Sequence, residues 1–196
     1  PDGGLTWGDR ITVASHAQSR DGMPGVARLS DGTLLAVFES FRDDDGGPFV
    51  IRSVTSTDDG ETWGNRRVVY APEQDDRHAG APSVITLADG RLVVAFMTDE
   101  DGPGGRWPDG ASIKLLYSDG VPNREGVVWS PVVTASDAPS FWPGLTALSG
   151  GGALLLYERE GPRVRRIRLD GEGCDDGNTV TEECEYGLEQ CTVCAA

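Results

Sequence analysis

Apolar and polar residues alternate along most of this chain in short runs, and Gly, Asp, Ser and Pro separate one run from the next. Alternation with a period of two is typical of β-strands that bury one face. No long stretch combines a 3.6-residue period with helix caps. The runs that predict strands are 24–29, 33–38, 49–55, 66–70, 82–87, 91–97, 112–117, 129–134, 141–148, 153–157 and 163–169. We therefore predict an all-β fold.

The strand pattern repeats along the chain. Pro24, Pro82 and Pro143 each begin the pattern P-x4-L-x2-G-x5-[FY], which recurs at intervals of about 60 residues. Each repeat holds four short strands, and repeated units of four antiparallel strands are the blades of a β-propeller. Residues 1–169 therefore predict about three blades. Propellers generally close with about four to eight blades, so we expect this part of the chain not to close a ring alone.

The turn between the third and fourth strands of the first repeat fits S-x-D-x-G-x-T-W over residues 56–63, with related segments at 2–7 and 118–129. We expect the aspartate to accept hydrogen bonds from N–H groups of the turn, the glycine to adopt a positive φ, and the tryptophan to cover apolar surface. The residues given this structural role are Ser56, Asp58, Gly60, Thr62 and Trp63.

Strand order assigns the connections to the two faces of a propeller. Turns between strands one and two, and between strands three and four, share one face. Connections between blades, and between strands two and three, share the opposite face, where we expect a ligand. The connections expected there are 14–23, 39–48, 72–80, 98–111, 135–140 and 158–162.

The S-x-D-x-G-x-T-W turn is the Asp box, and its combination with L-x-D-G-x-L-L-A-x-F-E at 29–39 resembles the sialidase (neuraminidase) superfamily of six-bladed propellers. The resemblance covers residues 1–169. It implies part of a secreted or surface glycoside hydrolase that acts on a terminal sugar. The alternative is a non-catalytic propeller that binds carbohydrate or protein, because the Asp box also occurs in propellers that hydrolyse nothing.

This resemblance also implies catalytic candidates at residues 35–45. One of Asp43, Asp44 and Asp45 would be the general acid/base, with Glu39 and Arg42 in support. Departure of a glycosidic oxygen requires a proton from a carboxylic acid, so the residue type fits this chemistry. Three consecutive aspartates are equally the pattern of a solvated loop.

The first repeat opens with Gly-Met-Pro at 22–24, where sialidases have Arg-Ile-Pro, whose arginine helps to grip the substrate carboxylate. Gly-Met-Pro, together with Phe-Trp-Pro at 141–143, is similar to the exo-arabinanase-like propellers, which use two carboxylates instead. That resemblance implies that Glu158 or Glu39 is a catalytic acid. The alternative is that both are rim carboxylates, paired with Arg159 and Arg42.

Further candidates lie in or beside the connections of the expected ligand face. Arg20 and Arg77 could pair with an anionic substrate or be solvated, and Trp107 and Trp142 could stack on a sugar or cap the core. The two histidines, His16 and His78, have no second ligand at metal spacing, which favours surface or core positions. We predict neither a metal nor a cofactor.

Charge narrows the choice of partner. The formal net charge is -15, which argues against nucleic acid, because binding that polyanion needs a basic face. No run of about 18 apolar residues exists, so we expect no transmembrane segment. The expected partner is a glycan or a small carbohydrate. Because the chain starts within a motif, we expect a fragment that is inactive alone and self-associates through open blade edges.

The last part of the chain, residues 170–196, has a composition of its own and predicts a separate module. It contains eight acidic residues, no basic residue and all four cysteines, which are Cys174, Cys184, Cys191 and Cys194. Its sequence at 171–180 resembles the cysteine-rich repeats of secreted and surface proteins of myxobacteria and their relatives. The resemblance implies disulfides and a location outside the cell or at the bacterial surface. Four cysteines allow three pairings, and all three stay open.

Overall fold

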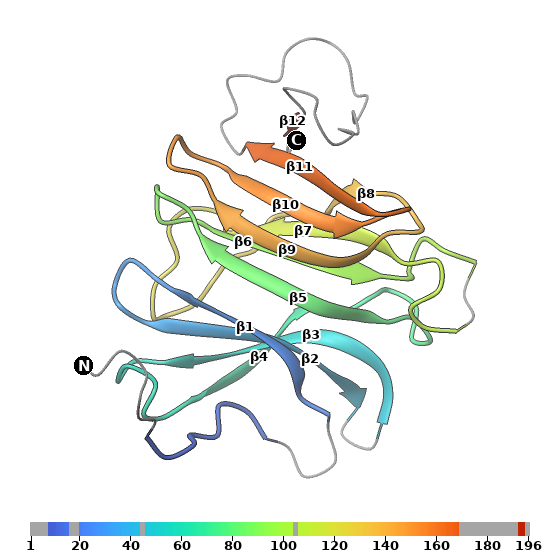
Figure 1. The fold of residues 1–196 in the computed structure, drawn as a ribbon. Coiled ribbons are helices and arrows are strands. Elements are labelled where there is room, and N and C mark those ends of the chain that lie inside the picture. The colour runs from blue at the N-terminus through green and yellow to red at the C-terminus, as the bar shows by residue number, and fades with distance from the viewer. Residues whose placement is uncertain (1–7, 16–19, 44–45, 104–105, 169–191, 195–196) are drawn as a thin grey trace.

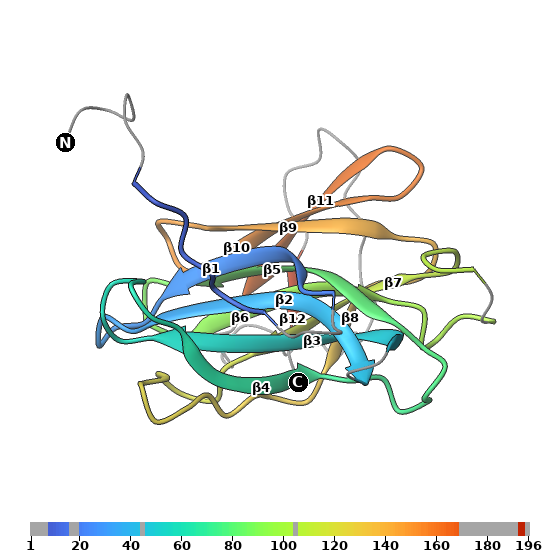
Figure 2. The ribbon, with the colours of Figure 1, turned by 90° about the horizontal axis from the view of Figure 1, so that it is seen from below.

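The computed structural model describes residues 8–15, 20–43, 46–103, 106–168 and 192–194. The regular structure of these residues consists of strands, arranged in three four-stranded sheets that follow one another as blades (Figures 1 and 2). The predicted all-β, propeller-type architecture is confirmed. In this part of the chain no helix is long and apolar enough to cross a membrane.

Blades 1 and 2 are antiparallel throughout, with their strands in sequence order. Blade 1 consists of β1 (Gly22–Arg28), β2 (Leu34–Asp43), β3 (Gly46–Ser56) and β4 (Gly64–Tyr70). Blade 2 consists of β5 (Ala79–Thr86), β6 (Leu92–Thr98), β7 (Ser112–Tyr117) and β8 (Val133–Ser136).

Blade 3 differs in its outer strand. Its first three strands, β9 (Phe141–Ala147), β10 (Ala153–Glu158) and β11 (Pro162–Arg168), are antiparallel as in the other blades. The fourth, β12 (Thr192–Cys194), comes from the cysteine-rich segment and runs parallel to β11. The other three cysteines, His16, Asp44 and Asp45 lie outside the described residues.

Two of the predicted strand boundaries were wrong. The outer strand of blade 2, expected at 129–134, begins at Val133, and Trp129 forms only an isolated bridge to Ser118. Pro131 has no N–H to give to a ladder, which explains the late start. In blade 1, residues 39–48 are not a long loop, because β2 continues to Asp43 and β3 begins at Gly46.

The core lies between the blades. Strand β6 has both faces covered, so that Val93, Val94, Ala95 and Phe96 are all at most 1% exposed. In blade 3 only one face is covered by described residues. Leu156, at the repeat position of the fully buried Ala95, is 51% exposed.

The connections divide between two faces as predicted. The loop face, at the right in Figure 1, carries the β2–β3, β6–β7 and β10–β11 connections and the segments between blades. The turn face, at the left, carries the β1–β2, β5–β6 and β9–β10 turns. The strand order therefore positions the candidate ligand residues at the right-hand end of the molecule.

The turn at residues 56–63 lies on the turn face. Asp58 accepts hydrogen bonds from the Thr62 hydroxyl (2.5 Å), the Thr62 N–H (2.9 Å) and the Ser56 hydroxyl (2.7 Å). These bonds, with the Thr62 hydroxyl foremost, lower the pKa of Asp58 to about 2. Gly60 has a φ of 95°, and the Trp63 Nε1–H donates to its carbonyl at 2.9 Å. The turn connects strands and faces away from the candidate site.

Candidate functional site

Glu39 lies within β2, and its side chain points between blades 1 and 2 rather than toward the rim. Its Oε2 accepts a hydrogen bond from the Ala81 N–H at 3.1 Å, and its Oε1 lies 2.8 Å from Nη2 of Arg20. The Glu39 side chain is 5% exposed, whereas that of Arg20 is 53% exposed. The alternative in which Glu39 is a rim carboxylate paired with Arg42 is therefore wrong. The buried carboxylate instead fixes the half-exposed guanidinium of Arg20.

The start of β5 is shaped to receive this carboxylate. A Cβ on Gly80 would lie 2.7 Å from the Glu39 Oε2 and 2.9 Å from Cζ2 of Trp107, so this close approach requires glycine. The β5–β6 register shifts between Gly80 and Ser83, and Ala81 has a φ of 48°. The bulge takes the Ala81 N–H out of the ladder, which lets it bind Glu39.

Aromatic rings surround the ion pair. The Arg20 guanidinium lies 5.0 Å from the ring centroid of Phe49, a cation–π contact. Phe49 meets His78 edge-on at 5.5 Å, and His78 stacks on Trp107 at 5.1 Å. We call Arg20, Glu39, Phe49, His78 and Trp107 the Glu39 cluster. It presents one positive charge and aromatic surface at the loop face.

A second buried carboxylate, that of Asp99, contacts the His78 of this cluster. Asp99 follows β6, has a side chain that is 3% exposed, and accepts a hydrogen bond from the His78 N–H at 2.7 Å. Its Oδ2 lies 3.4 Å from Nδ1 of His78. Asp99 thereby fixes the position of the His78 ring against Trp107.

Another ion cluster lies at the same blade boundary, on the outer strands. Glu100 accepts hydrogen bonds from the Tyr70 hydroxyl, from the Glu73 N–H at 2.7 Å and from Lys114 Nζ at 3.1 Å. Burial and the bond to Glu100 raise the pKa of Tyr70. Burial opposes ionisation of Glu100, but its hydrogen bonds outweigh burial and lower its pKa. We call Tyr70, Glu100, Asp101 and Lys114 the Lys114 cluster.

The remaining charged candidates lie elsewhere on the loop face. Asp43 is exposed at the end of β2. Arg42 donates to the carbonyls of Pro72 (2.8 Å) and Gln74 (3.2 Å), and its side chain is 19% exposed. Arg77 donates to the Asp99 carbonyl at 3.4 Å. Both arginines therefore hold the segment between blades 1 and 2 in place.

The inner strands of the three blades begin alike. Met23, Ala81 and Trp142 each precede a proline and have φ values of 52°, 48° and 54°. With these prolines they line a shallow pocket of about 230 Å³, in which Trp142 is 52% exposed. Glu158 occupies the repeat position of Glu39 in blade 3 and is exposed. The sequence candidates thus divide between the Glu39 cluster, this pocket and the rim.

Sequence reasoning missed several residues of these clusters, namely Phe49, Asp99, Glu100 and Lys114, and treated His78 as an isolated residue. Two signals were present in the sequence. Asp99, Glu100 and Asp101 follow an apolar strand directly, and Lys114 is a charged residue within an apolar strand. Among the residues that the structure describes, no three His, Cys, Asp or Glu side chains are grouped closely enough to hold a metal ion.

No family model and no curated protein matches the sequence. Solved structures match in fold. The Hadza microbial sialidase Hz136 gives a TM-score of 0.56 at 17% identity, over 77% of this chain and 35% of that protein. Zg3597, a family 117 glycoside hydrolase of the marine bacterium Zobellia galactanivorans, gives 0.55 at 15% identity, over 81% of this chain and 55% of that one.

The endo-arabinase of Bacteroides thetaiotaomicron gives a TM-score of 0.54 at 16% identity, over 76% of this chain and 56% of that protein. This chain therefore spans only about a third to just over half of the length of these three proteins. At such low identities the similarity shows the fold alone. The described blades have the propeller fold that sialidases share with other glycoside hydrolases.

Proposed function

We propose that this chain is part of an extracellular glycoside hydrolase that acts on a terminal sugar, and that the sugar binds on the loop face at the Glu39 cluster. One observation carries the proposal. A half-exposed guanidinium, that of Arg20, is held between the buried carboxylate of Glu39 and the ring of Phe49. The fold shared with three glycosidases supports the substrate class, and the cysteine-rich segment supports the location.

Arg20 is the ligand-binding cation in this proposal. Glu39 and Phe49 fix one edge and one face of its guanidinium, and the remaining N–H groups are left for a sugar carboxylate or hydroxyl. The indole of Trp107 is half-buried beside it and offers apolar surface for a sugar ring. A fixed guanidinium beside an aromatic ring suits recognition of a polar, ring-shaped ligand.

Hydrolysis also needs a proton donor. Both oxygens of Glu39 are engaged, so we assign Glu39 to the positioning of Arg20 rather than to proton transfer. We assign proton transfer to one of Asp43, Asp44 and Asp45, the first of which ends β2. Glu158 is the corresponding candidate in blade 3.

A non-catalytic carbohydrate- or protein-binding module is the second candidate. The observation that favours it is that both buried carboxylates of the region, Glu39 and Asp99, are held by hydrogen bonds. A binding module needs only the fixed guanidinium and the rings. In that case the three consecutive aspartates at 43–45 would have no role in catalysis.

The two candidates are separated by assays of the intact protein that contains this chain, on aryl glycosides that include sialosides and arabinosides. A hydrolase turns over at least one of them, and Asp45→Ala or Asp43→Ala lowers kcat by about 100-fold or more. Glu158→Gln has the same effect if blade 3 supplies the acid instead. Binding without turnover above background identifies the binding module.

The 196-residue chain is tested for glycan binding by calorimetry. We expect binding without turnover, and we expect Arg20→Ala and Trp107→Ala each to weaken binding about tenfold or more. Trp63→Phe, on the turn face, is the matched control and should leave affinity unchanged. Thermal unfolding of each variant separates loss of binding from loss of fold. Equal affinity in wild type and Arg20→Ala would refute the proposed site.

A further inference from the structure

The β1–β2, β5–β6 and β9–β10 turns on the turn face share a glycine of positive φ and one backbone hydrogen bond. Gly32, Gly90 and Gly151 occupy one repeat position and have φ values of 91°, 87° and 89°. Each donates its N–H to the carbonyl of the leucine three residues earlier, at 3.0, 3.0 and 3.1 Å. The glycine and its hydrogen bond are therefore shared by the three turns, whereas the next residue differs: Gly152 has a φ of 73°, and Thr33 and Arg91 do not have a positive φ.

That difference lies one residue earlier. In blade 1, Asp31 Oδ1 accepts a hydrogen bond from the Thr33 N–H at 3.0 Å, and in blade 2 the equivalent Asp89 Oδ1 accepts one from the Arg91 N–H at 3.0 Å. In blade 3 the equivalent residue is Gly150, which has no carboxylate to offer to the N–H of Gly152.

The two aspartates show what this backbone position does to an anion. The Thr33 N–H is the main cause that lowers the pKa of Asp31. Burial raises the pKa of Asp89, but the N–H and guanidinium of Arg91 outweigh burial and lower it. The turn therefore stabilises a carboxylate in both blades where the sequence supplies one.

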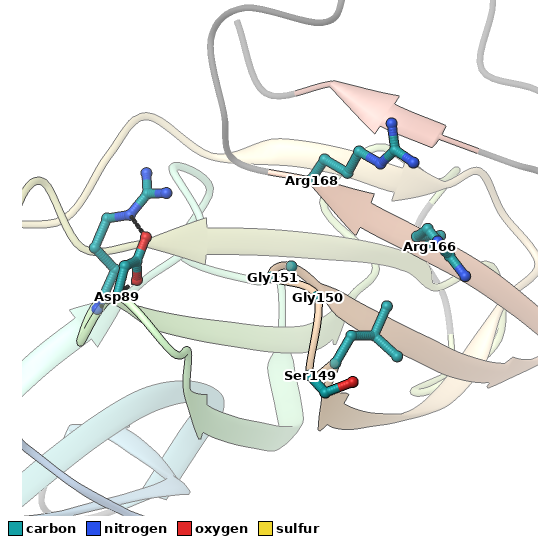
Figure 3. Close-up of a pocket in the computed structure, with 9 residues that line it drawn as sticks. Asp89, Ser149, Gly150, Gly151, Arg166 and Arg168 are labelled. Carbon is teal, nitrogen blue, oxygen red and sulfur yellow. Dashed lines mark hydrogen bonds and ion pairs between the residues drawn. The ribbon is translucent and has the colours of Figure 1, made fainter.

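The vacant position in blade 3 opens into a cavity of about 470 Å³. Figure 3 shows Gly150 and Gly151 between Asp89 on one side and Arg166 and Arg168 on the other. Both of these arginines are exposed, and neither forms an ion pair with a residue that the structure describes. The fold therefore places two cations beside a turn that has no carboxylate of its own for the Gly152 N–H.

The corresponding cavity at the β1–β2 turn is neutral. It has a volume of about 390 Å³ and contains Arg28 and Arg124 together with Asp31 and Asp59. Asp59 lies 2.8 Å from Arg28, and Asp31 accepts the N–H of Arg124 at 2.8 Å. At the β9–β10 turn three arginines line the cavity, and its one aspartate, Asp89, is paired with Arg91 at 2.7 Å. Of these two cavities, only the one at the β9–β10 turn has more cationic than anionic side chains.

We propose that the β9–β10 cavity binds the carboxylate of a small acidic ligand, which takes the place that Asp31 and Asp89 fill in the other blades. The Gly152 N–H donates to one carboxylate oxygen, and Arg166 and Arg168 supply charge-assisted hydrogen bonds. In a protein of net charge -15 this cavity is a local site of attraction for anions. It lies on the face opposite the Glu39 cluster and is independent of the proposed hydrolase site.

The test uses the whole 196-residue chain, labelled with ¹⁵N and titrated with D-galacturonate, with acetate and with the neutral sugar D-galactose. We expect the Gly152 amide signal to shift downfield on addition of galacturonate, because an N–H that donates to a carboxylate is deshielded. Galactose should leave it unmoved. If acetate shifts the signal as well, the site recognises the carboxylate group alone, and this result also supports the proposal.

Gly150→Asp is the decisive variant. A Cβ at this position meets no atom within 4 Å, so the substituted carboxylate can cap the Gly152 N–H as in blades 1 and 2. We expect it to weaken galacturonate binding at least about tenfold, whereas Gly150→Ala, the matched control, should bind within about twofold of wild type. Arg166→Ala combined with Arg168→Ala should also weaken binding about tenfold, and thermal unfolding checks that each variant is folded.

Three results would overturn the proposal. The first is a Gly152 signal that does not respond to either carboxylate. The second is an equal response to galactose. The third is a Gly150→Asp variant that is folded and binds galacturonate as tightly as wild type does.

Discussion

Two carboxylate–cation clusters lie at the boundary of blades 1 and 2, and they differ in how far the cation is exposed. In the Glu39 cluster the Arg20 side chain is 53% exposed, and in the Lys114 cluster the Lys114 side chain is 7% exposed. Glu100 meets three donors, all from the protein. Glu39 also has both oxygens bonded, but its cation, Arg20, is half-exposed.

This difference in exposure suits the Lys114 cluster to stabilising the fold and the Glu39 cluster to binding a ligand. A buried ion pair is tolerated when all its hydrogen-bonding groups are satisfied, and it then ties the elements that contribute to it. The Lys114 cluster has that form and connects β4 to β7. A half-exposed cation fixed by a buried carboxylate contributes little to stability, since water competes for it. Its fixed position is useful to a ligand.

The largest expected effect on stability is that of Lys114→Met. It leaves the Glu100 carboxylate, whose side chain is 11% exposed, without its cation, which should lower the free energy of unfolding by about 3–5 kcal/mol. Asp101, which is 49% exposed, loses less. Arg20→Ala, the matched change in the open cluster, should lower it by about 1 kcal/mol or less. Urea unfolding measures both changes. Equal losses of unfolding free energy in the two variants would contradict the proposed difference between the clusters.

Glu100 adds a pH dependence to the same comparison. Its pKa in the folded chain lies below its ordinary value of 4.5, so the unfolded state binds the proton more readily. The stability that Glu100 contributes should be complete at neutral pH and lost progressively as the pH falls below about 4.5. Glu100→Gln should flatten this part of the pH profile of unfolding, whereas Glu158→Gln should leave it unchanged.

A smaller effect is expected for Gly80→Ala. The new Cβ would lie 2.7 Å from the Glu39 carboxylate and 2.9 Å from Trp107, so the cluster must move, at a cost of about 1–3 kcal/mol. The ligand affinity should fall as well, because Arg20 is positioned through Glu39. Gly144→Ala is the control, since a Cβ there meets no atom within 4 Å. Matching melting temperatures for the two variants would contradict the assigned packing.

Glu39→Gln should change stability less, by about 1 kcal/mol, because the amide oxygen can still accept the Ala81 N–H and Arg20 is half-exposed. Glu158→Gln, at the same repeat position but exposed, should change it by less than about 0.5 kcal/mol. Glycan affinity should fall only in Glu39→Gln, since the guanidinium loses its anchor. A loss of affinity in both variants would indicate a site shared between the blades.

The smallest effect is expected for Asp58→Asn, because the amide oxygen still accepts the two hydrogen bonds made to Oδ1 and because water screens the lost charge of this exposed residue. The folded pKa of about 2 lies below the ordinary value of 3.8, so the contribution of Asp58 is present above about pH 4 and disappears toward pH 2. Asp58→Asn should remove that part of the acid transition. Asp59→Asn, in the same turn, should retain it.

The sequence predicted the blades because their signals are local. The spacing of Pro, Leu, Gly and the aromatic residue marks each strand pair, and the strand order then assigns the connections to the two faces. The turn at 56–63 was equally predictable, because all its hydrogen bonds lie within eight residues.

The site was less predictable because its contacts cross between blades. Glu39 is buried by Gly80, Ala81 and Trp107, which lie at least 40 residues away in the sequence. The Lys114 cluster likewise includes residues of two blades, because Tyr70 of blade 1 donates to Glu100 of blade 2. The carboxylate type at position 39 was readable from the pattern, whereas its burial and its pairing with Arg20 depend on the way blade 2 packs against blade 1.

The most direct test of the Glu39 cluster as the ligand site is a titration of the ¹⁵N-labelled chain with glycans, followed through the indole N–H signals. The chain has five tryptophans, and among the four that the structure describes only Trp107 belongs to the Glu39 cluster. The account predicts that the Trp107 signal shifts most, that the signals of Trp63 and Trp129 stay in place, and that Arg20→Ala abolishes the shift. A glycan that binds while moving only the Trp63 or Trp129 signals would contradict it.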